Sequence, residues 1–267
     1  MDPYTNPDQQ SDTTLQAMIT RLEERAKHSV FEGMIRDYIA EIPKDGPLVV
    51  LDFGCGTGVV IRALEPVLHP DSDLYGADIS SRLLESAQAL SEGTRIHWDK
   101  VEPQRLPYSS ETFDVIIMHT LLSHVSNPEA TLEEAARLLK PKGRLIVFDA
   151  DHAGTTFGLP EYSRMRECDF RLTSAIASHP DICRQMPRYL QAGGFQLRSH
   201  RSHVLSECGR GDFWLSSVRG FARLIPALGI LSEAEGEAWV KQMLEDHETG
   251  KFFAAGAFYT FHAEKAS

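Results

Sequence analysis

Residues 49–60 read Val-Val-Leu-Asp-Phe-Gly-Cys-Gly-Thr-Gly-Val-Val, an apolar run followed by three glycines at alternate positions and two valines. A short apolar, β-branched run predicts a buried strand, and the glycines predict a tight turn into a helix. Glycine has no Cβ and accepts a positive φ at low cost, so the backbone here can approach a ligand closely. The N-terminus of the next helix leaves N–H groups free for an anionic group such as a carboxylate. The stretch therefore predicts a ligand-binding loop between a strand and a helix.

Short β-branched runs alternate with amphipathic stretches on the C-terminal side of this loop. The runs expected to form strands are 48–53, 73–78, 94–98, 113–119, 144–149, 195–203 and 252–262. The stretches expected to form the intervening helices are 58–68, 80–90 and 127–139, each of which begins with Gly, Ser or Asn. Such alternation implies parallel βαβ units, with ligands at the carboxyl ends of the strands. The predicted fold class is α/β, a doubly wound, seven-stranded Rossmann-like sheet.

Three regions lie outside the alternating pattern. Residues 14–42 show apolar positions near a 3.6-residue period and are ended by Pro43, so residues 1–44 are expected to form a helical segment that covers the ligand site. Residues 45–267 are expected to form the ligand-binding domain. The strand pattern lapses in it at about 150–190 and 205–250, and these helical cap insertions are the candidates for a substrate cover.

The charge balance disfavours several partners. The chain has 27 lysines and arginines against 38 aspartates and glutamates, a net charge of −11, and no basic patch for nucleic acid or anionic membranes. No apolar run approaches the roughly 20 residues that cross a bilayer. The polar N-terminus lacks a signal-peptide pattern, and the four cysteines show no CxxC spacing. We expect a soluble, cytoplasmic monomer or homodimer that binds neither nucleic acid nor membranes.

An acidic residue ends the strand that follows the glycine loop. Asp78 lies 20 residues after Gly58, where a carboxylate can accept hydrogen bonds from both hydroxyls of a ribose. Loop and acid together predict a ligand that contains a nucleoside. A nicotinamide dinucleotide normally requires GxGxxG to seat its pyrophosphate, whereas this loop is GxGxG followed by Val59 and Val60. The mismatch disfavours NAD.

Four stretches of the chain together resemble one enzyme family. They are Leu51 to Gly58; Gly76-Ala77-Asp78-Ile79-Ser80; Leu106-Pro107-Tyr108 leading to Phe113-Asp114-Val115; and Glu134 through Arg137-Leu138-Leu139-Lys140-Pro141-Lys142-Gly143. The chain resembles the class I S-adenosylmethionine-dependent methyltransferases, on the branch related to ubiquinone and menaquinone biosynthesis methyltransferases. The resemblance covers residues 45–150. It implies methyltransferase activity with S-adenosylmethionine as the cofactor.

The resemblance also implies which residues bind the cofactor. The predicted set is Asp52, Gly54, Cys55, Gly56, Gly58, Asp78, Ile79, Asp99, Lys100 and His119. In this scheme the glycine loop lies against the methionine part and Asp52 orients the loop. Asp78 holds the ribose and Ile79 packs on the adenine. Asp99 meets the adenine amino group and is followed by Lys100, where the family usually has a small apolar residue. His119 lies beside the cofactor through its backbone.

The acceptor side is predicted from the loops after two strands. Methyl transfer from a sulfonium is an in-line displacement, so the protein must mainly position a nucleophile and exclude water, and a catalytic base is optional. His124 follows one strand, and Asp149 and His152 follow another, in Phe-Asp-Ala-Asp-His. These three residues are the candidate catalytic groups. The alternatives are that His124 packs at a helix start and that the second cluster is a turn; no second ligand set supports a metal site.

Polar and aromatic residues of the insertions are candidates for substrate contact. The polar ones are Tyr162, Arg164, Arg166, Arg171, His179 and Arg184, and the aromatic ones are Phe213, Trp214, Phe221 and Trp239. Solvated helix faces and core packing are the alternatives.

Three functions remain open on the sequence alone. The first is methyl transfer to a small-molecule, secondary-metabolite-like acceptor through an O, N or C nucleophile. The second is an enzyme that uses the bound cofactor as a fixed positive charge for a non-methylating reaction such as cyclisation. The third is a non-catalytic protein that has lost cofactor binding, which the intact glycine loop disfavours.

Overall fold

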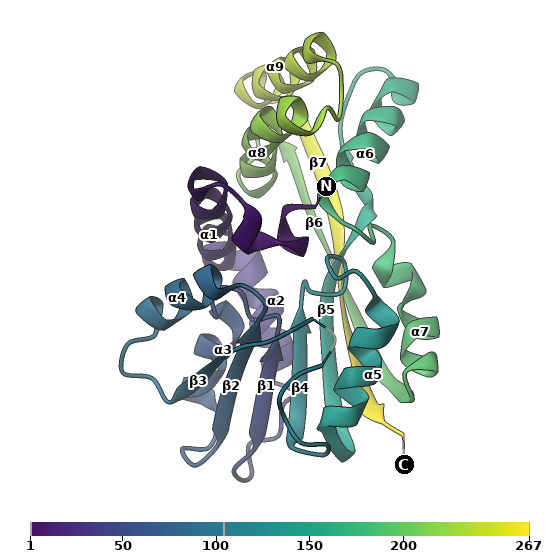
Figure 1. Cartoon of the computed structure of the whole chain (residues 1–267). Helices are drawn as coiled ribbons and strands as arrows, with labels where there is room; N and C mark the ends of the chain where they lie inside the picture. The colour runs from purple at the N-terminus through teal and green to yellow at the C-terminus, as the bar shows by residue number, and fades with distance from the viewer. Residues whose placement is uncertain (1, 104, 267) are drawn as a thin grey trace.

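The computed structural model describes residues 2–103 and 105–266. Its centre is a seven-stranded sheet with the strand order β3-β2-β1-β4-β5-β7-β6 (Figure 1). The strands are β1 Val49–Phe53, β2 Asp73–Asp78, β3 Ile96–Lys100, β4 Phe113–His119, β5 Leu139–Phe157, β6 Phe195–Gly209 and β7 Phe252–Lys265. Neighbouring strands from β3 to β5 are parallel, whereas β7 is antiparallel to β5 and β6. The predicted α/β, doubly wound sheet is confirmed.

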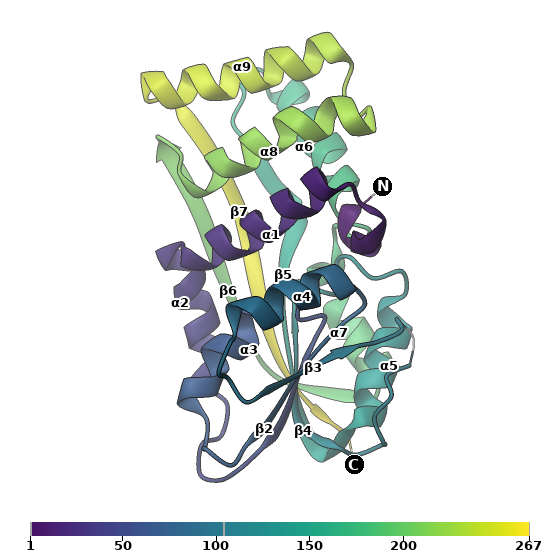
Figure 2. The same ribbon diagram turned by 60° about the vertical axis from the view of Figure 1, so that its left-hand side comes forward.

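Helices cover both faces of the sheet because its central strands are apolar on both sides. Val50 of β1 packs in one hydrophobic core and Leu51 in the other. The crossover helices are α3 Val59–Leu64, α4 Ser81–Leu90, α5 Pro128–Leu138 and α7 Ile182–Ala192 (Figure 2). Side-chain caps begin two of them: Ser80 Oγ accepts from the Leu83 amide, and Asn127 Oδ1 accepts from the Ala130 amide.

The three strands at one end of the sheet, β5, β7 and β6, are longer than the sequence indicates. β5 was expected to end at 149 and β6 at 203, but they continue to Phe157 and Gly209, each paired with β7. These extensions carry α6 Tyr162–Ile176, α8 Phe213–Leu228 and α9 Glu233–Thr249 beyond the parallel strands (Figure 1). The expected insertion at 150–190 is therefore only partly a cap, since α7 packs against the sheet and α5.

The N-terminal segment forms two short 3₁₀ turns, α1 Asp12–Lys27 and α2 Ser29–Ile39. The break between the two helices falls at His28, whose backbone is extended. In Figures 1 and 2, α1 lies between α4 and α8, above the carboxyl ends of the parallel strands. Across residues 2–103 and 105–266, no helix has both the length and the apolar character needed to cross a bilayer.

Candidate active site

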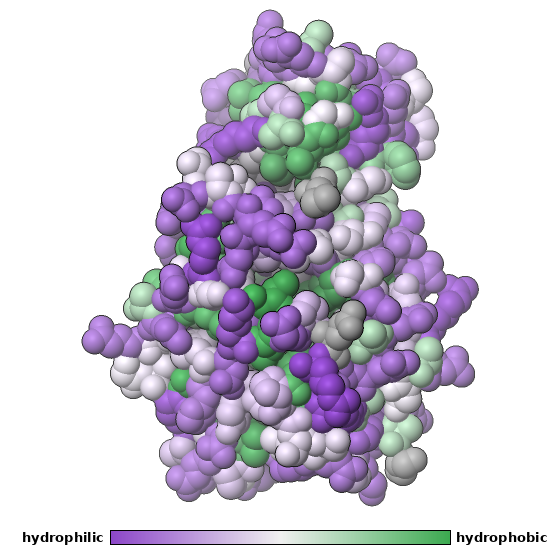
Figure 3. Space-filling model, in the orientation of Figure 1, coloured by the Kyte–Doolittle hydropathy of each residue, from purple (hydrophilic) through white to green (hydrophobic). Residues whose placement is uncertain are grey.

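A cavity of about 1390 Å³ lies between the carboxyl ends of β1, β2 and β4, the N-terminal segment and α8. Figure 3 shows apolar side chains in the middle of this face and under α8 and α9, surrounded by mostly hydrophilic ones. Nine of the predicted site residues line the cavity: Asp52, Gly54, Cys55, Gly56, Asp78, Ile79, His119, His124 and His152. Four predicted residues are not part of its wall: Gly58, Asp99, Lys100 and Asp149.

The glycine loop has the backbone that its sequence predicts. Gly54, Gly56 and Gly58 all have positive φ, at 77°, 54° and 78°. A side chain at Gly54 would meet Leu121, so glycine there also serves packing. Gly58 caps the start of α3, and a side chain there would meet the Trp98 ring, which accounts for glycine at this position without a ligand contact. The loop therefore offers Gly54 to Thr57 to the cavity.

Asp78 is held between the glycine loop and the start of α4. One carboxylate oxygen accepts from the Gly56 amide at 2.8 Å, and the other accepts from the Ser80 amide at 2.8 Å. Burial raises the pKa of Asp78. Each oxygen keeps a free lone pair toward the cavity, since a carboxylate oxygen accepts two hydrogen bonds.

Asp52, at the end of β1, is a buried carboxylate without a partner. It is 1% exposed, and neither side-chain oxygen has a hydrogen-bond partner among residues 2–103 and 105–266. Burial, together with the negative charge of Asp78, raises the pKa of Asp52 to about 7. The backbone of Ile61 in α3, the helix after the loop, offsets part of this rise in pKa, and the expected role of orienting the loop stays a prediction. A buried carboxylate that lines a cavity and has no hydrogen-bond partner is suited to bind a cationic group of a ligand.

The end of β3 does not contribute the predicted adenine contact. The Asp99 carboxylate accepts from the Tyr108 hydroxyl at 2.7 Å, and Lys100 Nζ donates to Ser81 Oγ at 2.9 Å. The cavity is lined on this side by Val101 and Pro103. The chain after β3 therefore presents an apolar surface where a carboxylate was expected.

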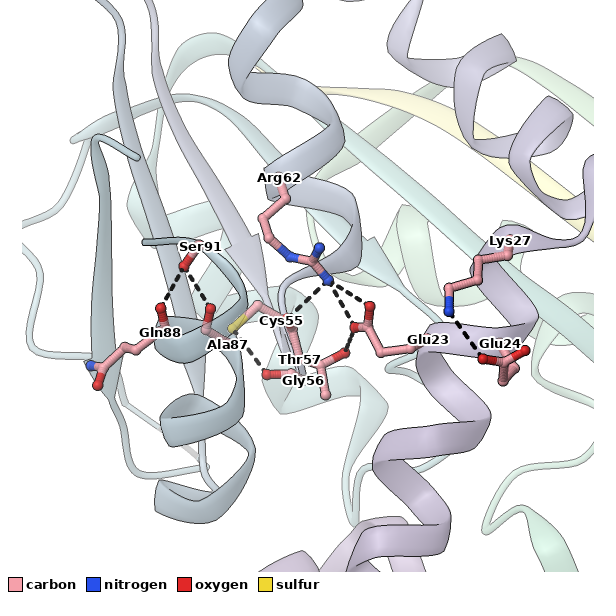
Figure 4. Close-up of polar contacts among 10 residues, drawn as sticks. All are labelled: Glu23, Glu24, Lys27, Cys55, Gly56, Thr57, Arg62, Ala87, Gln88 and Ser91. Carbon is pink, nitrogen blue, oxygen red and sulfur yellow. Dashed lines mark hydrogen bonds and ion pairs between the residues drawn. The ribbon is translucent and has the colours of Figure 1, made fainter. Parts of the chain in front are cut away.

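Carboxylates of the N-terminal segment hold it against the glycine loop and α4. Glu23 of α1 accepts from Thr57 Oγ1 at 2.6 Å and from Arg62 Nη2 at 2.8 Å (Figure 4). Asp8 accepts from the Ser81 amide at 3.1 Å, at the N-terminus of α4. Sequence reasoning missed both residues, because only the fold brings the segment over these helix starts.

His124 is oriented by a residue near the start of the chain. Its Nδ1 lies 2.7 Å from Asp2 Oδ2, and Asp2 also accepts from the Ser178 amide at 3.1 Å. Asp2 is buried, whereas His124 lines the cavity. Within the part of the chain that the structure describes, His124 Nε2 has no hydrogen-bond partner, and it is free to meet a ligand.

Asp149 and His152, which the sequence places at and after the end of a strand, both lie within the long strand β5 and have different surroundings. Asp149 is fully buried and accepts from the Ser123 amide at 3.0 Å and the Ala150 amide at 2.9 Å. It fixes the turn that carries His124 and does not face the cavity, which corrects its expected role. His152 does line the cavity. Burial lowers the pKa of His152 to about 3, so its imidazole is neutral at physiological pH.

His119 is engaged through its side chain. Its Nδ1 lies 2.8 Å from the Tyr38 hydroxyl of α2, and its ring stacks on Phe148 with centroids 4.6 Å apart. Burial holds the pKa of His119 well below its usual value. The expected backbone contact of His119 with the cofactor remains a prediction.

The insertions contribute fewer residues to the cavity wall than expected. Phe213 and Phe221 line the cavity, whereas Trp214 and Trp239 are core residues. The predicted polar set, Tyr162, Arg164, Arg166, Arg171, His179 and Arg184, lies outside the wall. The wall instead contains Arg21, Arg25, Arg219 and Arg223, which helical periodicity alone does not separate from solvated residues. Among the described residues no cluster of metal-ligating side chains is found.

Comparison with known proteins agrees with this architecture. Residues 51–147 match the family model described as a methyltransferase domain, Methyltransf_11. The chain is 27% identical over 187 residues to the ubiquinone/menaquinone biosynthesis C-methyltransferase UbiE of Desulfotalea psychrophila, covering 66% of this chain and 69% of that protein. It is 37% identical over 133 residues to the demethylmenaquinone methyltransferase of Tropheryma whipplei, covering 49% and 54%.

A solved structure shares the fold at low sequence identity. The [4+2]-cyclase SpnF superposes with a TM-score of 0.59 at 19% identity, covering 90% of this chain and 84% of that one. The chain spans between 44% and 69% of the length of the curated relatives it matches.

The fold, the glycine loop and the matched segment define the class I S-adenosylmethionine-dependent methyltransferases. Among proteins of this class, the chain is similar to the methyltransferase UbiE and to a demethylmenaquinone methyltransferase.

Proposed function

We propose that the protein transfers a methyl group from S-adenosylmethionine to a hydroxyl of a small, partly apolar molecule. The observation that carries the proposal is the single cavity, which joins Asp52, Asp78 and the glycine loop to the free Nε2 of His124. Phe213 and Phe221 add apolar surface to the same space, as an enclosed acceptor of this kind requires.

The residues present fit the cofactor. Asp78 would accept hydrogen bonds from the ribose hydroxyls, and the unpartnered Asp52 would meet the ammonium group of the methionine part. Gly54 and Gly56 allow the backbone to approach that part closely. When bound, S-adenosylmethionine supplies a methyl carbon whose bond to sulfur breaks with both electrons staying on sulfur. The protein binds and orients the cofactor and the acceptor, and it excludes water from them.

His124 would serve the acceptor. The hydroxyl oxygen uses a lone pair for the new bond to carbon, and its proton passes to Nε2 of His124. Asp2 holds Nδ1, so it fixes the ring orientation and favours the tautomer that leaves Nε2 unprotonated. Asp2 is thus a positioning residue and His124 the general base.

The fold alone does not distinguish methyl transfer from a scaffold role of the cofactor, since the [4+2]-cyclase SpnF has the same fold. The two differ in products. We would incubate the protein with S-adenosylmethionine and a metabolite extract and analyse the mixture by mass spectrometry. S-adenosylhomocysteine together with a product heavier by one methylene supports methyl transfer. Conversion without S-adenosylhomocysteine would support the scaffold function.

Cofactor binding is tested separately by titration. We expect Asp78→Ala to weaken S-adenosylmethionine binding by about 2 kcal/mol, because two hydrogen bonds to the ribose are lost. Asp73→Ala is the matched control, since Asp73 is exposed at the other end of the same strand. Equal affinities of the two variants, both folded, would contradict the site assignment.

A further inference from the structure

The wall formed by α1 and α8 is rich in arginine, although the chain carries a net charge of −11. It contains Arg21, Arg25, Arg219 and Arg223. Over residues 2–103 and 105–266, none of these four forms an ion pair with a carboxylate. Two acidic residues of the cavity wall differ, because Asp12 pairs with Arg82 and Asp78 is hydrogen-bonded to the glycine loop. Asp52 has no partner among the described residues. The positive charge of this wall is therefore available to an anionic group of a ligand.

Arg25 is the most enclosed of the four. Its Nε atom is buried and has no partner among the described residues, and Nη2 donates a long hydrogen bond to Thr120 Oγ1 at 3.3 Å. The guanidinium lies 4.7 Å from the centroid of the Phe31 ring. A neutral hydroxyl and an aromatic face compensate only part of the cost of removing a guanidinium from water. Burial lowers the pKa of Arg25 to about 10, and the group stays charged at neutral pH.

Arg25 lies beside the chain that follows β4. Thr120 follows β4, as His124 does, and the charge of Arg25 contributes to the lowered pKa of His119 at the end of β4 and of His152 within β5. Glu23, two residues earlier on α1, bonds to Thr57 of the glycine loop. Residues two apart point to different sides of a helix, so α1 presents a carboxylate to the cofactor half and a guanidinium to the other half.

We propose that the acceptor carries a carboxylate that Arg25 binds, with its apolar body against Phe213 and Phe221. This inference rests on the proposed function, because it names the class of acceptor for the same cavity. A guanidinium donates two parallel hydrogen bonds to a carboxylate, which fixes the orientation of the acceptor as well as its affinity. The hydroxyl that receives the methyl group is a separate substituent of the same molecule, near His124.

The test uses benzoate as the probe and benzamide as its neutral analogue. Binding is measured by calorimetry in saturating S-adenosylhomocysteine, which occupies the cofactor half and its own carboxylate subsite. Benzoate is expected to bind the wild type at least tenfold more tightly than benzamide. Arg25→Met should remove that difference. Arg36→Met, an exposed arginine on the neighbouring helix outside the cavity wall, should leave it unchanged.

The possible outcomes show whether Arg25 binds the carboxylate of the acceptor or that of the cofactor. If Arg25→Met weakens S-adenosylhomocysteine tenfold and leaves benzoate unchanged, Arg25 serves the cofactor carboxylate and the proposal is overturned. Equal binding of benzoate and benzamide to the wild type also overturns it. A wild type that binds no S-adenosylhomocysteine refutes the proposed function, while benzoate titrated alone still decides the role of Arg25. Melting curves complete the test: Arg25→Met should melt no lower than the wild type, whereas a structural arginine would leave a less stable protein.

Discussion

Replacing Asp52 by Asn should stabilise the ligand-free protein at alkaline pH while weakening cofactor binding. The side chain is buried, and neither oxygen has a partner among the described residues. Burial and the charge of Asp78 raise its pKa from 3.8 to about 7. Each pKa unit corresponds to about 1.4 kcal/mol, so keeping this carboxylate ionised in the folded state costs about 4 kcal/mol. Asparagine has nearly the same shape and does not carry that cost.

The sign of the pH dependence follows from the two pKa values of Asp52. Below pH 3.8 the group is protonated in both states and contributes nothing to the difference. Between about pH 4 and 7 the unfolded chain releases the proton while the folded chain retains it, so rising pH favours unfolding. Above about pH 7 the cost is complete. Asp52→Asn should therefore match the wild type near pH 4 and exceed it by about 4 kcal/mol at pH 8.

Urea unfolding at pH 4.5 and pH 8 measures this difference, and Asp73→Asn, at an exposed site, is the control. The same variants are titrated with S-adenosylmethionine. Loss of a charged hydrogen-bonded contact of about 1.5–3 kcal/mol predicts affinity ten- to a hundredfold lower for Asp52→Asn. The reasoning is refuted if Asp52→Asn is less stable than the wild type at pH 8, because Asp52 would then be making a stabilising contact in the free protein.

Two further predictions concern the acceptor half. Asp2→Asn should lower kcat about tenfold or more and leave S-adenosylmethionine affinity unchanged, since Asp2 contacts His124, Ser178 and Tyr4 and not the glycine loop or Asp78; an unchanged kcat would remove Asp2 from the site. His152→Asn should make the protein less sensitive to acid, because the pKa of His152 is about 3 when folded and 6.5 when unfolded, so the unfolded chain alone gains a proton as pH falls below 6.5. Urea unfolding at pH 5 should show a gain of about 1–2 kcal/mol, absent at pH 8.

The side of the cavity that holds the glycine loop was predictable from the sequence because its signals are local. The glycine loop, its preceding strand and Asp78 lie within 30 residues of one another, and each follows from backbone geometry or from strand periodicity. Asp99 shows the limit of such reasoning. Its position after a strand matched the expected adenine contact, but its partner Tyr108 is presented by a later loop, and the two form a pair away from the cavity.

The acceptor half was predicted less well because it is assembled from distant segments. His124 and His152 were found as polar residues after strands, whereas Asp2, 122 positions before His124, gave no sequence signal. The arginines of the wall were missed for a similar reason. Arg25 has the spacing of an ordinary residue near a helix C-terminus, and only the packing of α1 between α4 and α8 encloses it.

Asp52 and Arg25 carry opposite charges in one cavity and are not paired with each other. A fold selected for stability alone would neutralise both, because each unpaired buried charge costs free energy and nearby polar groups could satisfy it. Asp52 lies in β1 just before the glycine loop, and Arg25 donates to Thr120 after β4. With the proposed ligands, Asp52 would select a cation beside the glycine loop and Arg25 an anion beside β4. That division would keep the acceptor carboxylate away from the subsite of the cofactor ammonium, and it would account for the stability lost at both positions.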